Sequence, residues 1–414
     1  MKHTFASRFL AIFSVLMVLS LGVSMVAAQD NVIKIASQSP LSGGQSELGT
    51  GLRNGTELAI EQLGGDLEAM GFDIQFVPFD DQATPDVGVA NAQQIVADSA
   101  ILGVIGHFNS GVAIPSSEVY NANDLVMISP ANTNVNITDR GLPTVNRVVG
   151  RDDLQARVGA EFIAGRDDVE SVYILHDTTA YGQGIAEFLR DELEVRGVSV
   201  LGFEGTEERS NFEGIIQPIL ALAPDLVYMG AIYDQMGVFV NQLRAAGYTG
   251  LLMGPDGLDS PVYAELAGEA GVGTYYTSVS GPASAYPAAA QFIEDFTAKF
   301  GEPPIPFAAQ AYDSTAILID AIERAVEANG GELPSRAQVA EQVRATENFE
   351  GVTGNITFDA NGDPEIAVYH ILEVGSSDPT EWLNNPSLTT LEFPSPLHAA
   401  EMEMMATPEA TPES

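Results

Sequence analysis

Short apolar runs alternate with amphipathic stretches along most of this chain. Residues 101–105 and 125–128 are apolar, rich in β-branched side chains and only four or five residues long, which is typical of strands buried in a parallel sheet. Between such runs, apolar residues recur every three or four positions, which predicts helices with one buried face. The repeated strand–helix order predicts an α/β protein with doubly wound parallel sheets and right-handed crossovers.

The predicted elements form two series, because the rhythm restarts after residues 147–153. The first series contains strands at 32–37, 73–79, 101–105 and 125–128, with helices at 48–63, 87–97 and from 112. The second series contains strands at 169–175, 198–202, 226–229, 250–253 and 273–278, with helices at 154–164, from 181, 212–222 and 235–246. Two further helices are expected at 288–300 and 310–327. Late strands at 352–359 and 366–374 are expected to join through the turn pair Asn361-Gly362.

Two of the predicted strands end in loops of small hydroxyl and amide residues, at 107–111 and 129–133. Ligands of open α/β sheets bind just outside the carboxyl ends of the strands, so Ser110 and Thr133 should face one crevice. A helix begins near Val112, and its free backbone N–H groups suit a small carboxylate. No nucleophile–base pair lies nearby, which favours binding a molecule over converting it.

Composition narrows the class of protein. The 414 residues are 45% hydrophobic and 18% charged, as in globular proteins with large cores. A formal net charge of −40 repels nucleic acids and anionic lipids. The absence of cysteine excludes disulfides, thiolate metal sites, cysteine nucleophiles and a lipid anchor on cysteine. The sequence also contains no G-x-S-x-G elbow, P-loop or G-x-G-x-x-G motif.

Both ends of the chain differ from its globular part. Residues 1–28 have the features of a secretory signal, with Lys2 and Arg8 before an apolar run and small residues before Gln29. An uncleaved membrane anchor is the alternative, since about 20 apolar residues can span a bilayer. Residues 398–414 form a low-complexity acidic tail that is not expected to pack.

Several stretches, taken in order, resemble the type I periplasmic solute-binding proteins of ABC transporters for branched-chain amino acids. The resemblance extends from about residue 32 to residue 374. The stretches that carry it are Ile33-Lys34-Ile35, Pro40-Leu41-Ser42-Gly43, Phe79-Asp80-Asp81, Ile105-Gly106-His107, Ser129-Pro130-Ala131-Asn132-Thr133-Asn134, Gly150-Arg151-Asp152-Asp153-Leu154-Gln155, His176-Asp177, Tyr181-Gly182-Gln183-Gly184, Phe203-Glu204-Gly205 and Gly254-Pro255-Asp256-Gly257.

This resemblance implies the periplasmic-binding-protein type I fold, with two lobes joined by a three-stranded hinge. Crossings near Gly150, Ser280 and Val352 would assign residues 30–150 plus 281–352 to the first lobe and 151–280 plus 353–390 to the second. It also implies an exported, non-enzymatic and monomeric receptor without a cofactor or metal. Such a receptor acts in the periplasm or on the outer side of the cytoplasmic membrane and delivers its solute to an ABC permease.

The resemblance also implies roles for individual residues. Ser110 would bind the ligand carboxylate, while Ala131, Asn132 and Thr133 form the loop that offers backbone groups and a hydroxyl. Tyr181 would close over the ligand from the second lobe, and Asp256, where relatives often have Glu, would pair with the α-ammonium group.

Two positions depart from the family pattern, and each implied role has a purely structural alternative. Ile232 and Leu48 stand where relatives often have aromatic residues, so the pocket wall should be aliphatic, with Phe108 as a further wall residue. Helix or turn capping is the structural alternative for Ser110, Thr133 and Asp256, although ligand contact is favoured at these three positions, and a half-buried surface position is the alternative for Tyr181.

Two histidines and two aspartates also stand at strand ends. We interpret His107 and His176 as structural histidines and Asp80-Asp81 as loop caps, since no second His or EF-hand pattern lies nearby.

We therefore expect a receptor that closes on an aliphatic amino acid by hinge motion. Three alternatives stay open. The first is the same fold binding an amide, a urea or an aromatic acid. The second is a ligand-sensing module for a signalling partner, and the third is a secreted hydrolase.

Overall fold

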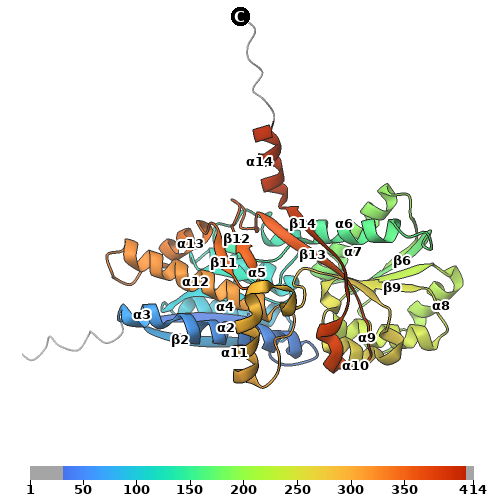
Figure 1. The fold of residues 1–414 in the computed structure, drawn as a ribbon, viewed down its shortest axis with the longest axis horizontal. Helices are drawn as coiled ribbons and strands as arrows, with labels where there is room; N and C mark the ends of the chain where they lie inside the picture. Colours follow the sequence, from blue (N-terminus) through green and yellow to red (C-terminus); the bar gives the residue numbers. More distant parts are fainter. Residues whose placement is uncertain (1–30, 407–414) are drawn as a thin grey trace, which may run out of the picture.

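The computed structural model describes residues 31–406 as two α/β lobes, each built around its own sheet (Figure 1). The predicted signal segment, 1–28, lies outside the described residues. Within the described part of the chain, no helix combines the length and apolar character needed to cross a membrane.

The first lobe contains a five-stranded parallel sheet in the order β2-β1-β3-β4-β5. Its central strands are apolar on both sides, as expected for a sheet covered by helices on both faces. In β3, Leu102 and Ile105 pack on one face and Ile101 and Val104 on the other. The strands are β1 (Val32–Ser39), β2 (Asp73–Asp80), β3 (Ile101–Gly106), β4 (Val126–Ser129) and β5 (Val145–Arg147).

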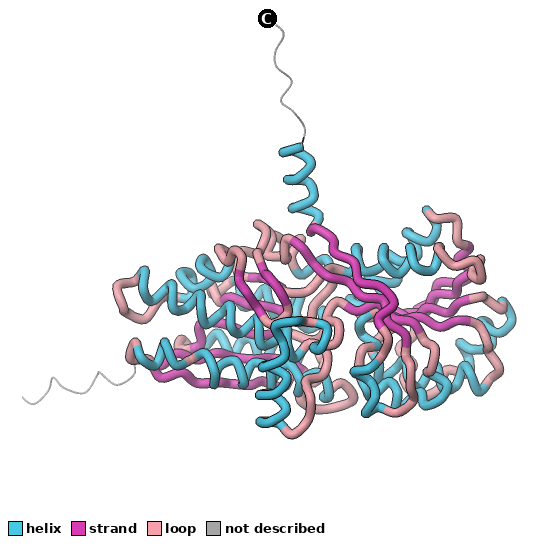
Figure 2. Tube along the Cα trace, viewed as in Figure 1, coloured by secondary structure: helices cyan, strands magenta, loops and turns pink. Residues whose placement is uncertain are grey.

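Helices from both ends of the sequence cover this sheet. The face of Leu102 and Ile105 packs against helices α12 and α13, and the opposite face packs against α4 and α5. Helix α2 lies along α12, with α11 packed beside it, so segments some 250 residues apart share one core (Figures 1 and 2). These helices are α2 (Ser46–Leu63), α3 (Gly65–Ala69), α4 (Pro85–Ala97), α5 (Ser110–Asn121), α11 (Ala290–Phe300), α12 (Ala308–Ala328) and α13 (Arg336–Arg344).

The second lobe contains a seven-stranded sheet in the order β14-β13-β10-β9-β8-β6-β7. The five strands from β10 to β7 in this order are parallel, whereas β13 and β14 pair antiparallel with their neighbours. The strands are β6 (Ser171–His176), β7 (Ser199–Gly205), β8 (Leu226–Gly230), β9 (Leu251–Gly254), β10 (Tyr275–Ser278), β13 (Ile366–Glu373) and β14 (Ser387–Pro394).

Two groups of helices cover the faces of this second sheet. On β8, Tyr228 faces the helices α6 and α7, whereas Val227 and Met229 face α8, α9 and α10. The α-helices are α6 (Asp152–Ala164), α7 (Ala180–Val195), α8 (Glu213–Leu222), α9 (Tyr233–Ala245) and α10 (Pro261–Ala267). Short 3₁₀ turns complete both lobes at η1 (Val135–Ile137), η2 (Asp256–Leu258), η3 (Gly268–Gly271), η4 (Ala283–Ala285), η5 (Pro287–Ala289) and η6 (Pro379–Asn384).

The chain passes between the lobes three times, after β5, after β10 and before β13. The expected crossing near Val352 falls inside a small hairpin formed by β11 (Phe349–Gly351) and β12 (Gly354–Ile356). This hairpin belongs to the first lobe, because Ile356 and Phe358 pack in its core and Asp313 of α12 accepts the N–H group of Val352 at 2.8 Å. We therefore propose that the third crossing lies within residues 359–365.

The late strands also pair differently from the prediction. Asn361-Gly362 does form a turn, with Gly362 at a φ of 91°, but only one bridge, between Phe358 and Pro364, closes it. Strand β13 instead pairs with β10 and with β14, a strand that was not predicted. Beyond β14, helix α14 (Pro396–Ala406) projects from the body of the molecule, so the start of the predicted tail is helical (Figure 1). The last predicted tail residues, 407–414, lie outside the described part.

Candidate functional site

A cleft of about 760 Å³, part of it an open mouth, lies between the two lobes. Loops at the carboxyl ends of β3 and β4 form one wall, and loops after β8 and β9 form part of the other. This is where an α/β fold binds small molecules. The lining residues are Gln45, Ala83, Pro85, Phe108, Asn109, Ser110, Gly111, Val112, Ala131, Asp177, Thr179, Ala180, Tyr181, Arg209, Ile232, Asp256 and Gly257.

The first-lobe wall presents the N-terminus of α5 to the cleft. Ser110 is the first residue of this helix and is 2% exposed, and Asn109 precedes it as the N-cap residue. No described side chain accepts the first free N–H groups of this helix. Free amides, the helix dipole and the Ser110 hydroxyl together form a suitable site for a carboxylate.

The second-lobe wall presents the carboxylates of Asp177 and Asp256, of which Asp256 is the predicted ligand contact. The Tyr181 hydroxyl donates a hydrogen bond to Asp256 Oδ1 at 2.7 Å and accepts one from the Gly257 N–H group at 2.8 Å. Burial raises the pKa of Asp256 to about 6, and the Tyr181 hydrogen bond partly offsets that effect. Asp256 is therefore mostly ionised at neutral pH and lacks a cationic partner among the hydrogen bonds and ion pairs of the described residues. A ligand cation would supply one.

Asp152 lies behind this wall and was not predicted as a site residue. Neither of its oxygens has a hydrogen-bond partner among the described residues. Burial and the nearby charge of Asp256 raise its pKa well above the ordinary value, while Thr133 and Arg147 lower it in part. The Asp152 carboxyl group therefore favours its neutral form and does not compete with Asp256 as a charged acid beside the cleft.

Six of the nine predicted ligand contacts line the cleft, and three are buried beside it. Those that line the cleft are Phe108, Ser110, Ala131, Tyr181, Ile232 and Asp256. Tyr181 is only 6% exposed, so it is not a half-buried surface residue. The remaining three predicted contacts, Leu48, Asn132 and Thr133, are buried next to the cleft and are not among its lining residues.

Each of these three buried residues has a structural reason for its position. Leu48 lies on the face of α2 that packs into the apolar core. Asn132 connects the loop after β4 to the loop after β3, because its Oδ1 accepts the His107 N–H group at 3.0 Å and its Nδ2 donates to the Phe108 carbonyl at 2.8 Å. The Thr133 hydroxyl lies close to the Asp152 carboxyl group, whose pKa it lowers.

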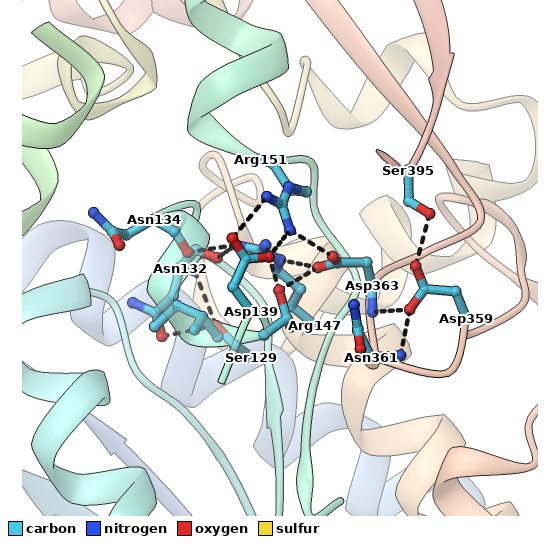
Figure 3. Close-up of polar contacts among 12 residues, drawn as sticks. Ser129, Asn132, Asn134, Asp139, Arg147, Arg151, Asp359, Asn361, Asp363 and Ser395 are labelled. Carbon is cyan, nitrogen blue, oxygen red and sulfur yellow. Dashed lines mark hydrogen bonds and ion pairs between the residues drawn. The ribbon is translucent and has the colours of Figure 1, made fainter. Parts of the chain in front are cut away.

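A buried ion network joins the loop after β4 to the hinge (Figure 3). The fully buried Arg147 side chain donates to the carbonyls of Asn132 at 3.1 Å and Asn134 at 2.9 Å. Its Nε also pairs with Asp363, in the third crossing segment, at 2.6 Å. Arg151, from the first crossing segment, pairs with the second oxygen of Asp363 at 3.0 Å. The position of the loop after β4 therefore depends on the first and third crossing segments.

The electrostatics of this network favour its ionised form. Burial alone would raise the pKa of Asp363, but Arg147 and Arg151 together keep it below its ordinary value. Asp139 and Asp153 contribute further carboxylates to Arg151, at 2.6 and 3.0 Å. Sequence reasoning quoted Arg151 as part of a motif but missed the role of Arg147 and Asp363, which lie 216 positions apart.

Sequence reasoning also missed the polar residues at the mouth of the cleft. Gln45, Asp177 and Arg209 line it beside the predicted contacts, but each lies in a loop or cap without apolar periodicity. The signal available for Asp177 was its position directly after a predicted strand.

The histidines and loop aspartates have the structural roles expected of them. His107 is fully buried between Asp81, 3.2 Å from its Nδ1, and Tyr120, on which its ring stacks. His176 accepts the Thr178 N–H group at 3.2 Å, and Asp80 accepts the N–H group of Leu41 at 2.9 Å.

Two lobes around a lined cleft, with an anion site on one wall and an acid on the other, define a class of receptor that binds small solutes. The model of one family, described as periplasmic binding protein, matches residues 32–378, and the chain belongs to that family. It is therefore a binding protein rather than an enzyme, with the type I fold that the sequence predicted.

Known relatives agree with this assignment. The chain is 31% identical over 343 residues to a leucine-, isoleucine-, valine-, threonine- and alanine-binding protein of Pseudomonas aeruginosa, covering 83% of this chain and 90% of that protein. The leucine-binding protein LivK of Thermotoga maritima has a similar structure, with a TM-score of 0.77 at 26% identity over 87% of this chain and 98% of its own. An ABC transporter substrate-binding protein of Desulfitobacterium hafniense in complex with Leu gives a TM-score of 0.70 at 25% identity, covering 86% and 100%.

Proposed function

We propose that this protein binds an aliphatic α-amino acid between its lobes and presents the closed form to an ABC permease outside the cytoplasmic membrane. The observation that carries the proposal is the polarity of the cleft. The uncapped N-terminus of α5 with Ser110 faces it from one lobe, and Asp256 faces it from the other. A zwitterion would satisfy both walls with one molecule.

The other lining residues suit an aliphatic side chain. Phe108, Ala131 and Ile232 line the same cleft and are all nearly buried, and Ile232 has no hydroxyl to satisfy. Burial of a leucine-sized side chain among them contributes roughly 1.5–3 kcal/mol to binding. The names of the relatives support the same class of ligand, since they include leucine, isoleucine and valine.

Export and membrane partnership belong to the same proposal. Family membership supports a role outside the cytoplasm, the signal-like segment 1–28 supports export, and the lack of cysteine argues against a lipid anchor on that residue. We propose that the receptor acts as a monomer and needs neither a cofactor nor a metal.

Calorimetry on the purified protein tests this proposal. Bound solute is first removed by unfolding and refolding, and leucine, isoleucine, valine, acetamide, urea and benzoate are then titrated separately. We expect one binding site per chain for at least one of the three branched-chain amino acids. Acetamide, urea and benzoate should give no binding heat. Binding of an amide, urea or benzoate without any amino acid would favour the alternative ligand classes and reject the proposal.

A further inference from the structure

Polar side chains from both lobes meet at the mouth of the cleft, apart from the proposed ligand contacts. Gln45 is the N-cap residue of α2 in the first lobe, and Asp234 lies in the first turn of α9 in the second. Gln45 Nε2 donates to Asp234 Oδ1 over 3.5 Å, at the long end of the hydrogen-bond range. This contact connects the lobes directly.

Each partner is positioned by its own lobe. Asn109 donates to Gln45 Oε1 at 2.7 Å, and Arg209 lies 3.2 Å from Asp234 Oδ2. Asn109, Gln45 and Arg209 all line the cleft, so the row of four side chains crosses its mouth. The backbone also approaches closely, because a Cβ atom on Gly44 would lie only 3.0 Å from Asp234 Oδ2.

A second contact between the lobes also lies beside the cleft. Asn134, in the loop after β4, donates to the carbonyl of Ala180 at the start of α7 at 2.7 Å. Gly184 makes room for it, since a Cβ atom there would lie 2.8 Å from Asn134 Nδ2. Two hydrogen bonds between the lobes therefore lie beside the cleft, one through Gln45 and one through Asn134.

We propose that Gln45 and Asp234 form a latch that closes the mouth of the cleft and controls how fast the ligand leaves. The proposal rests on the proposed function, because it needs a ligand in the cleft. The latch bond spans the two lobes, so it exists only when they are closed. It should therefore slow dissociation and leave association nearly unchanged.

A double-mutant cycle on the dissociation rate tests the latch. Gln45→Ala and Asp234→Ala should each raise koff of the amino acid that the wild type binds, by about fivefold, as expected for loss of one long and therefore weak hydrogen bond. The double variant should dissociate no faster than the faster single variant, because both changes remove the same bond. Stopped-flow measurement should show kon within about twofold of the wild type.

The matched control uses the same chemistry within one helix. Gln183 donates to the Glu187 carboxylate at 2.8 Å on the exposed face of α7. Gln183→Ala, Glu187→Ala and their double variant should leave koff unchanged, since this pair does not connect the lobes.

A rescue variant separates the latch from a merely structural role. Gln45→Glu alone places a carboxylate opposite Asp234 and should raise koff further, whereas Gln45→Glu with Asp234→Asn exchanges donor and acceptor and should return koff toward the wild-type value. Effects of the two alanine changes that multiply, or a failed rescue in folded variants, would overturn the latch. Failure of the wild type to bind any amino acid would instead reject the proposed function.

Discussion

We expect ligand recognition to depend most on Asp256, because it is a buried carboxylate without a cationic partner in the described structure. Asp256→Ala should raise the Kd for leucine about a hundredfold, as expected when one partner of a buried ion pair is removed. Calorimetry with leucine and with 4-methylpentanoate, which lacks the ammonium group, separates this effect from a change of shape. Equal losses for both compounds would contradict pairing between Asp256 and the ammonium group.

The same residue predicts how binding depends on pH. Since the pKa of unliganded Asp256 is about 6, protonation below that value removes the partner of the ammonium group. Affinity should therefore rise with pH through about 6 and level off above 7, and binding near pH 5.5 should release protons because the bound cation lowers this pKa. Calorimetry in buffers of different ionisation enthalpy measures the release. Asp256→Asn should abolish it. Release of the same size in that variant would instead point to Asp152 or to Asp259, a buried acid whose pKa burial also raises to about 6.

At the scale of single elements, strand β5 and the third crossing segment depend on one buried ion network. Asp363→Ala would leave Arg147 and Arg151 with one carboxylate fewer in a buried site, which should lower the free energy of unfolding by about 3 kcal/mol. The matched control is Asp168→Ala, which breaks an exposed pair with Arg166 and should change that free energy far less. Urea unfolding of both variants measures the difference. Equal effects would mean that the network contributes no more than a surface pair.

Elements with strong periodicity could be predicted from the sequence, and those that depend on distant partners could not. Apolar runs predicted β1 to β4 and β6 to β10 close to their observed bounds. The central strands β3, β4 and β8 are buried on both faces, whereas β2 and β7, at the sheet edges, are only partly buried. Strand β5 has three residues, one of them a charged arginine, and is ordered by its neighbours. Helix α13 has few apolar residues, and β14 is an edge strand whose Leu388 is exposed.

The candidate site could likewise be predicted from the sequence only in part. Its predicted lining residues follow strand ends, whose position in an α/β fold is known once the strands are known. Gln45, Asp234 and Asp363 act through partners that are distant in sequence, 189 positions apart for Gln45 and Asp234 and 216 for Arg147 and Asp363, and only the folded chain brings those partners together.

The whole molecule should unfold differently with and without ligand, because the proposed binding mode places the ligand in contact with both lobes. Trp382, the only tryptophan in the sequence, is buried in the second lobe against Tyr276, so its fluorescence reports unfolding of that lobe. At a ligand concentration of 100 times Kd, the free energy of unfolding should rise by about 2.7 kcal/mol, whether it is measured by fluorescence or by far-UV circular dichroism. The two transitions should coincide. In Asp256→Ala at the same leucine concentration, both shifts should nearly vanish. A shift seen only in Trp382 fluorescence would mean that the ligand binds to the second lobe alone and does not close the cleft.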